Sequence, residues 1–245
     1  MTDQKPPRER LDDHPDWVIR ATDALARLVF RATTRVRLEG LDRLRGLDGP
    51  VLIVANHVSN ADAPLVGSFL IPALGRRIHW LGKQEALDWP ILGRIFARNG
   101  VIGIRRGEAD IEAFRAAKHV LDEGHVLCIF PEGTRSPTGA LQEAKEGTAI
   151  LALRTGARIL PVGIVGTGGV WPRGRALPRP GGRVALRVGD PFTLSAVGTG
   201  SARRVGQQAA TQEIMRRIAE LLPPAQRGAY AAAVAAGGSD GDPVR

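Results

Sequence analysis

Seven short strand-like segments alternate with helical patterns along most of this chain, and this alternation limits the fold more than any other feature of the sequence. The segment 51–54 is apolar at every position, which is typical of a strand buried on both faces of a sheet. Strands that are separated by helices pair through crossovers, and crossovers give a largely parallel sheet. We therefore predict an α/β fold with a mixed, largely parallel sheet flanked by helices. The predicted strands are 35–39, 51–54, 78–82, 101–104, 126–130, 159–165 and 184–188.

An amphipathic helix is predicted over 16–33, before the first strand. Asp16 is placed to cap it, and its apolar residues recur at steps of three and four. Arg20, Arg27 and Arg31 fall between them. Two interpretations stay open. The apolar face packs on the domain core, or the helix lies on a bilayer.

Further helices are predicted over 111–123, where Asp110 is the candidate cap, and over 143–155 and 207–222. No linker divides the chain, so we predict one main domain over 34–227. The proline-containing segment 1–15 and the Ala- and Gly-rich segment 228–245 are predicted to be flexible tails.

The location of the protein is constrained by what the sequence lacks. No apolar run reaches the ~18 residues of a membrane span. The amino terminus has no apolar signal-peptide region, and one cysteine excludes a disulfide framework. We therefore expect a cytoplasmic protein, either soluble or attached to a membrane surface.

Positive charge is concentrated in the second half of the chain. The formal net charge is +9, from 34 Lys+Arg against 25 Asp+Glu, and residues 151–205 contribute +8 of it. Such a stretch favours anionic partners, namely phosphorylated small molecules, an acidic membrane surface or nucleic acid. A solvated basic surface is the alternative. The nine arginines are Arg154, Arg158, Arg173, Arg175, Arg179, Arg183, Arg187, Arg203 and Arg204.

A candidate acid–base pair follows the predicted strand 51–54. Histidine is the usual general base near neutral pH, and a carboxylate on its other ring nitrogen fixes the tautomer. His57 and Asp62 are five residues apart, which is ~140° of rotation on a helix. They meet only if His57 lies in the loop and Asp62 lies in the first turn of the next helix. The alternative is that Asp62 is only a helix cap and His57 a loop histidine.

Two more polar clusters follow predicted strands, where sites gather in open α/β sheets. Arg105 and Arg106 lie in a glycine-flanked turn after 101–104, and arginine binds phosphate in a bidentate manner. A denser cluster follows 126–130 and combines a carboxylate, a glycine, a hydroxyl and a guanidinium. Its residues are Glu132, Gly133, Thr134 and Arg135.

The order of these motifs resembles the glycerolipid acyltransferase family, and among its members the bacterial lysophosphatidate (1-acylglycerol-3-phosphate) O-acyltransferases. The likeness runs from about Val36 to Pro191. It rests on His-x4-Asp, then Gly-x5-Arg, then Phe-Pro-Glu-Gly-Thr-Arg, then Leu-Pro-Val. One departure is Gly103, which stands where the family usually has a bulky apolar residue.

The resemblance implies how the residues divide the chemistry. His57 would take the proton of an acceptor hydroxyl, and Asp62 would orient His57. The hydroxyl would attack the thioester of acyl-CoA or acyl carrier protein, with no metal and no other cofactor. The acceptor would be a lysophospholipid at a membrane surface, which places the protein on the inner face of the cell membrane. Its phosphate and glycerol pocket would be formed by Arg106, Glu132, Gly133, Thr134 and Arg135, with Lys83 adding positive charge.

A covalent acyl-enzyme is not expected. The nucleophile motif Gly-x-Ser-x-Gly is absent, and Cys128 lies in an apolar strand, where a core thiol is the simpler interpretation.

Two other classes of function remain as alternatives. A metallohydrolase would use His57, Asp62, His125 and Glu132 as ligands, although no His-x-His or His-Glu-x-x-His pair is present. A nucleic-acid-binding module would rest on the basic stretch alone, and 11 aromatic residues in the whole chain offer few stacking platforms. Within the acyltransferase interpretation, a lysolipid of the ornithine type is the other acceptor.

Overall fold

The computed structural model describes residues 16–104, 109–172, 174–175, 177–195 and 201–237. Seven strands of this part form one sheet in the order β1-β7-β6-β2-β5-β3-β4. Neighbouring strands are parallel except for the antiparallel pair β6 and β7. The predicted fold class is thus confirmed. The strands are β1 (Arg35–Glu39), β2 (Val51–Ala55), β3 (Ile78–Lys83), β4 (Val101–Ile104), β5 (Val126–Ile129), β6 (Arg158–Val165) and β7 (Arg183–Val188).

The central strand β2 has every residue buried, as its continuous apolar sequence predicts. Side chains alternate between the two faces of a strand. Val51 and Ile53 therefore enter the core on one side of the sheet, while Leu52 and Val54 enter the core on the other. β2 lies between β5 and β6, so its carboxyl end is placed in the middle of one edge of the sheet.

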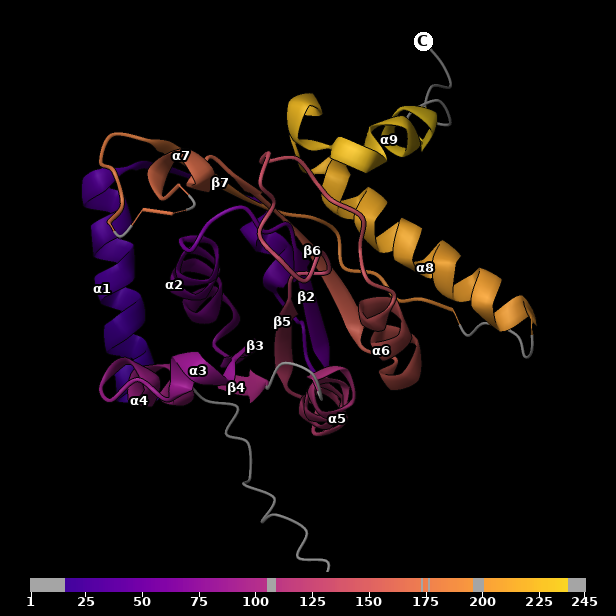
Figure 1. Cartoon of the computed structure of the whole chain (residues 1–245), viewed down its shortest axis with the longest axis horizontal. Helices are drawn as coiled ribbons and strands as arrows, with labels where there is room; N and C mark the ends of the chain where they lie inside the picture. Colours follow the sequence, from indigo (N-terminus) through magenta and orange to yellow (C-terminus); the bar gives the residue numbers. More distant parts are fainter. Residues whose placement is uncertain (1–15, 105–108, 173, 176, 196–200, 238–245) are drawn as a thin grey trace, which may run out of the picture.

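Helices cover both faces of this sheet (Figure 1). α1 and α2 lie over one face, and α5, α6 and α8 lie over the other. The helices are α1 (Trp17–Thr33), α2 (Asp62–Leu74), α3 (Gln84–Leu87), α4 (Leu92–Arg98), α5 (Ala109–Asp122), α6 (Gly147–Thr155), α7 (Thr167–Val170), α8 (Ser201–Glu220) and α9 (Ala231–Gly237), with 3₁₀ turns at Leu41–Leu44, Pro224–Gln226 and Gly228–Tyr230.

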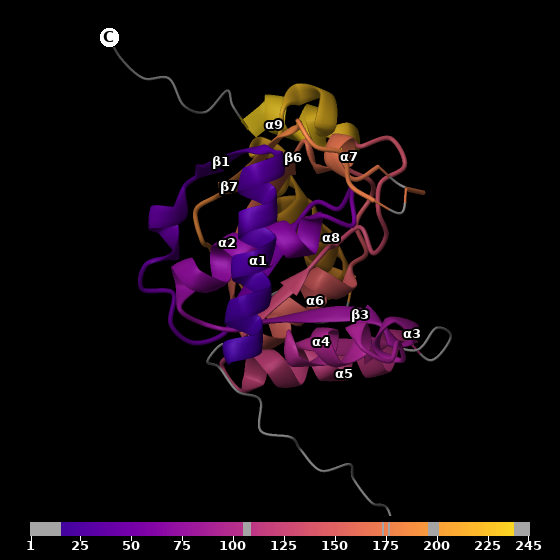
Figure 2. The same cartoon turned by 90° about the vertical axis from the view of Figure 1, so that its left-hand side faces the viewer.

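The amphipathic helix α1 has the predicted cap, because the Asp16 side chain accepts the N–H of Ile19 at 2.9 Å. One side of α1 packs inward through Ile19 and Phe30, which are buried. The outward side presents Leu25 and Leu28, which are 62% and 65% exposed. Figure 2 shows α1 on the outside of this layer, in front of α2. Core packing thus occupies only one face of the helix. No helix in the described ranges is long and apolar enough to cross a membrane.

Helix α6 begins at Gly147, and the prediction of helix from residue 143 is wrong. The backbone N–H groups of Gln142, Ala144 and Lys145 donate to acceptors elsewhere in the molecule, so this segment is not helical. Gly156 ends the helix in the left-handed region with φ 64°, as predicted.

Two other helix starts also differ from prediction. α5 begins at Ala109, so Asp110 lies inside its first turn and is not its cap. α8 begins at Ser201, six residues before the predicted start at 207.

The predicted carboxyl-terminal tail is corrected by the structure. Residues 228–237 form a 3₁₀ turn followed by α9, and Tyr230 is buried with 3% of its surface exposed. This one aromatic side chain docks a segment whose composition otherwise suggests fraying. The predicted tail 1–15 and residues 238–245 lie outside the described residues.

Candidate active site

Two loops meet at the carboxyl ends of β2 and β5, because these strands are parallel neighbours with Val54 opposite Ile129. One loop covers residues 56–61 and the other covers residues 130–146. The ring of His57 from the first loop stacks on the ring of Phe130 from the second, with centroids 4.1 Å apart. The sheet thus brings together the first and third polar clusters of the sequence.

His57 and Asp62 form the predicted pair. Nδ1 of His57 lies 2.7 Å from Oδ2 of Asp62, which is the first residue of α2. The same oxygen accepts the backbone N–H groups of Val58 at 2.7 Å and Ser59 at 2.8 Å. Asp62 is fully buried. Its carboxylate therefore orients the imidazole and holds the backbone of the 56–61 loop. The alternative that Asp62 is only a helix cap is wrong, because Ala61 holds the N-cap position and no side chain caps this helix.

The geometry defines which nitrogen of His57 is available. An ionised carboxylate only accepts hydrogen bonds, so Asp62 favours the tautomer with its proton on Nδ1. Nε2 then carries a lone pair, and no group among the described residues hydrogen-bonds it. The His57 side chain keeps 21% of its surface exposed. It is placed to take a proton from a hydroxyl that enters from solvent.

Glu132 lies beneath His57. Its Oε1 accepts the backbone N–H of His57 at 2.7 Å, and its Oε2 accepts the backbone N–H of Gln142 at 3.0 Å. Burial raises the pKa of the Glu132 carboxyl, while these two hydrogen bonds act in the opposite direction. The backbone carbonyl of His57 accepts the N–H of Ser136 at 2.7 Å. Both backbone groups of His57 are therefore held by the 130–146 loop.

The remaining residues of the third cluster form an exposed turn beside the 56–61 loop. Gly133 has φ 69°, and a Cβ there would lie 3.0 Å from Cε of Lys145. Thr134 is exposed. Arg135 donates to the side-chain oxygen of Asn60 at 2.8 Å. A guanidinium thus contacts the loop that carries His57, and an ammonium lies beside the turn that follows Glu132.

The structure positions only one of the two remaining predicted binding residues. Lys83 is the last residue of β3, a parallel neighbour of β5, so it lies at the same edge of the sheet as Phe130. Arg106 lies outside the described residues, and β4 ends before it at Ile104.

The alternative metal site is contradicted by the fold. His125 immediately precedes β5, whereas Glu132 follows its carboxyl end, and the strand between them separates the two by ~13 Å or more. His57 and Asp62 lie at the Glu132 end. No group of three candidate ligands occurs among the described residues.

The described arginines of the basic stretch 151–205 are spread over the sheet. Arg158 begins β6, while Arg183 begins the antiparallel β7, so these two arginines lie at opposite ends of the strands. Arg187 is paired with Glu39 at 3.1 Å.

Three residues that were not predicted to belong to the site support the 56–61 loop. The side-chain amide of Asn56 donates to the carbonyl of Ile164 at 2.9 Å and accepts its N–H at 2.7 Å. The Ser59 hydroxyl donates to the carbonyl of Trp171 at 2.8 Å. Asn60 accepts from Arg135 as described above. In the sequence, the signal for these supporting residues is the polar run 56–62, which directly follows the buried strand β2.

Comparison with known proteins relates this chain to acyltransferases. A family model described as Acyltransferase matches residues 35–165, which is more than half of the chain. A lyso-ornithine lipid O-acyltransferase of Pseudomonas aeruginosa is 36% identical over 142 residues, which cover 57% of this chain and 51% of that protein. A 1-acyl-sn-glycerol-3-phosphate acyltransferase of the same organism is 27% identical over 199 residues, covering 80% and 74%.

A chloroplastic 1-acyl-sn-glycerol-3-phosphate acyltransferase of Arabidopsis thaliana is 30% identical over 142 residues, or 57% of this chain. The match spans only 38% of that relative's length, so the likeness is to one part of it. Among solved structures, the 1-acyl-sn-glycerophosphate acyltransferase of Thermotoga maritima aligns with a TM-score of 0.64 and 25% identity. That alignment covers 80% of this chain and 78% of the other.

Proposed function

This chain belongs to the acyltransferase family, and from that membership we propose that it transfers a fatty acyl group to the free hydroxyl of a lysophospholipid. The proposed donor is acyl-CoA or acyl carrier protein. The favoured acceptor is 1-acylglycerol-3-phosphate, which gives phosphatidate. The observation that carries the proposal is the imidazole of His57, oriented by Asp62 at 2.7 Å with Nε2 left for a substrate proton.

The proposed reaction is a direct acyl transfer. Nε2 of His57 takes the proton of the acceptor hydroxyl as its oxygen attacks the thioester carbonyl. Asp62 stabilises the imidazolium that forms. The tetrahedral intermediate collapses, the carbon–sulfur bond breaks, and the thiolate leaves and takes the proton from His57. This route uses no metal and no other cofactor, and it needs no covalent acyl-enzyme.

Cationic side chains around His57 support a phosphate on the acceptor. Arg135 is held beside the 56–61 loop by Asn60, and Lys145 lies against Gly133. Charge-assisted hydrogen bonds from such groups are the usual means of binding a phosphate monoester. We propose that Arg135 and Lys145 contact the acceptor phosphate, and that Arg106 and Lys83 add to this site, as the family resemblance implies.

A lysolipid with an ornithine headgroup is the second candidate acceptor. The observation in its favour is the 36% identity with the lyso-ornithine lipid O-acyltransferase of Pseudomonas aeruginosa. The chemistry at His57 would be unchanged, because the acceptor again supplies a hydroxyl. Only the contacts to the headgroup would differ.

We also propose that the protein binds the inner face of the cell membrane through α1. The outward apolar residues Trp17, Leu25 and Leu28 are 75%, 62% and 65% exposed. At ~100° per residue they lie on the side opposite the buried Ile19 and Phe30. A helix with exposed Trp and Leu and with arginines along its flank is suited to an anionic bilayer surface.

An acceptor panel tests the proposed reaction. Purified protein is given radiolabelled acyl-CoA or acyl carrier protein, with lysophosphatidate, neutral lysophospholipids or lyso-ornithine lipid as acceptor. His57→Ala should reduce transfer by roughly 10²–10⁴-fold. The matched control is His119→Ala, because His119 lies on α5, away from the site, and pairs only with Glu123 at 3.8 Å. Wild-type turnover in folded His57→Ala would overturn the mechanism.

A further inference from the structure

The carboxyl-terminal segment 226–230 contacts the active-site loop from its outer side. The backbone N–H of Leu141 donates to the carbonyl of Gln226 at 2.9 Å, and the N–H of Ala229 donates to the carbonyl of Leu141 at 3.4 Å. A Cβ on Gly228 would overlap that same carbonyl, so the two backbones approach as closely as glycine allows. Residue 141 is thus fixed between two points of this segment.

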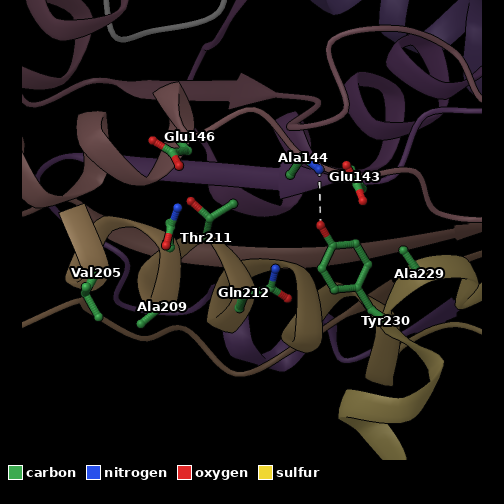
Figure 3. Close-up of a pocket in the computed structure, with 10 residues that line it drawn as sticks. Glu143, Ala144, Glu146, Val205, Ala209, Thr211, Gln212, Ala229 and Tyr230 are labelled. Atoms are coloured by element: carbon green, nitrogen blue, oxygen red, sulfur yellow. Dashed lines mark hydrogen bonds between the residues drawn. The ribbon is translucent and has the colours of Figure 1, made fainter.

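Tyr230 supplies the side-chain part of this contact. Its hydroxyl accepts the backbone N–H of Ala144 at 3.1 Å (Figure 3). The ring is buried, and burial raises the pKa of the Tyr230 phenol, so the hydroxyl keeps its own proton at neutral pH. Figure 3 shows the hydroxyl pointing from the carboxyl-terminal segment toward Ala144, across a groove that α8 also lines.

The segment between these two contacts is connected to His57 through hydrogen bonds of Glu132. Gln142 lies between Leu141 and Ala144, and both its backbone N–H and its side-chain amide donate to Oε2 of Glu132, at 3.0 and 3.4 Å. The other oxygen of Glu132 accepts the N–H of His57. Residues 141–145 have no helix or strand of their own to fix them. Their position therefore depends on these hydrogen bonds.

We propose that Tyr230 is a positioning residue for His57, acting through Ala144, Gln142 and Glu132. The inference rests on the proposed acyl transfer for its kinetic consequence. Tyr230 contacts Ala144, whereas Glu132 contacts Gln142, so Tyr230 acts on Glu132 through the 142–144 segment. Its hydroxyl keeps the segment in the place from which Gln142 reaches Glu132, and Glu132 in turn keeps the backbone of His57 in register with Asp62.

Tyr230→Phe tests the inference because it removes one oxygen and keeps the ring. We expect kcat to fall by up to about fivefold, which corresponds to the loss of one ordinary hydrogen bond from the support of His57. The KM for the acyl donor should stay unchanged. Thr211→Val is the matched control: Thr211 lines the same groove, but its hydroxyl donates to Gln207 within α8. All assays use conditions under which urea titration shows each variant fully folded.

A double variant separates positioning from stability. If Tyr230 acts through Glu132, then Glu132→Ala, which removes the acceptor of both Gln142 donors, should lower kcat, and adding Tyr230→Phe should lower it little further. Multiplicative effects, or wild-type kcat in Tyr230→Phe, would overturn the inference.

Amide exchange gives a readout that is independent of catalysis. Tyr230→Phe should speed exchange at both Ala144 and His57, and Thr211→Val should change neither. Faster exchange at Ala144 with unchanged exchange at His57 would break the proposed connection. Wild-type protein that transfers no acyl group would refute the proposed function, and the exchange result would still decide whether Tyr230 positions His57.

Discussion

The imidazole of His57 lies flat against the ring of Phe130, with the ring planes 14° from parallel. The ring is held on its face by this stack and on its edge by the hydrogen bond to Asp62. Its backbone is held by Glu132. The proposed general base is thus confined in three ways that keep Nε2 aimed in one direction, and such preorganisation would lower the entropic cost of proton transfer.

Asp62→Asn should nearly abolish acyl transfer. An amide in place of the carboxylate cannot stabilise the imidazolium and permits the wrong tautomer, so we expect a loss of at least ~10²-fold in kcat. The amide oxygen can still accept from Val58 and Ser59, which should preserve the turn. Steady-state kinetics with circular dichroism check this. The control is Asp122→Asn, which removes an exposed partner of Lys118 on α5 and should leave turnover unchanged.

Arg135→Ala should weaken use of the phosphorylated acceptor by about 10–100-fold in kcat/KM, the effect of one lost charge-assisted contact. The KM for the donor should change little. Asn60→Ala provides the comparison, since it removes the side chain that Arg135 contacts and leaves the guanidinium. If both variants lose the same activity with a neutral lysolipid as with lysophosphatidate, Arg135 organises the two loops and does not bind phosphate.

Cys128→Ala should retain most of the activity. The thiol is buried in β5, and burial raises its pKa far above the usual range, so it supplies no thiolate nucleophile. A small loss of stability, on the order of 1 kcal/mol, is expected from the lost packing. Acyl transfer is measured before and after treatment with a thiol-alkylating reagent. Complete loss of activity in folded Cys128→Ala would restore covalent catalysis as a mechanism.

The strands were predictable because each is a short apolar segment with its own local signal. All seven predicted strands occur, with bounds that shift by at most one residue at either end. The His57–Asp62 pair was predictable for a similar reason, since a five-residue spacing permits contact only across a loop and a helix start. Both inferences use residues that are near each other in the sequence.

The support of the site was not predictable, because it depends on which strands become neighbours. Glu132 and Gln142 reach the backbone of His57 only because β5 pairs with β2, and 75 residues separate His57 from Glu132. The irregular segment before α6 has helix-forming residues, yet tertiary hydrogen bonds use its backbone donors. Sequence patterns do not indicate hydrogen bonds between distant segments. For the same reason, the proposed role of Tyr230 could not be predicted from the sequence.

Asp23→Asn should stabilise the protein at neutral pH. Asp23 lies buried between α1 and α2, Oδ1 is 3.5 Å from where a Cβ on Gly67 would lie, and Oδ2 has no hydrogen-bond partner in the described structure. Burial raises the pKa of Asp23 to about 6, with Arg27 acting in the opposite direction. Each tenfold change in ionisation equilibrium corresponds to about 1.4 kcal/mol, so ionised Asp23 costs at most ~3 kcal/mol.

The pH dependence of this effect has a defined sign. A carboxyl with a raised pKa binds its proton more tightly in the folded state, so the contribution of Asp23 to wild-type stability falls as pH rises from about 4 through about 6. The free energy of unfolding of Asp23→Asn minus that of wild type should therefore grow over this window and then level off. Urea titrations at pH 4.5 and 7.5 measure it. An equal difference at both pH values would contradict the assignment.

Replacing Leu25 and Leu28 by serine should reduce membrane binding without affecting the core. Both side chains project outward from α1. Each contributes roughly 1.5–3 kcal/mol when fully buried, so the lipid concentration for half-binding should rise by about 100-fold or more. Ile111→Ser is the matched control, because Ile111 is 65% exposed on α5, over the other face of the sheet. Vesicle sedimentation with neutral and anionic lipid, at low and high salt, measures the effect.

The salt series separates the two parts of the proposed membrane contact. Attraction between arginines and anionic lipid is screened beyond about 10 Å at 0.1 M salt, while burial of leucine in the bilayer interface is not screened. High salt should therefore release only part of the wild-type protein and nearly all of the serine variant. If wild-type protein stays in the supernatant with anionic vesicles at low salt, α1 is not a membrane contact. Because the opposite face of α1 already packs on the core, its exposed leucines would then require a partner other than a membrane.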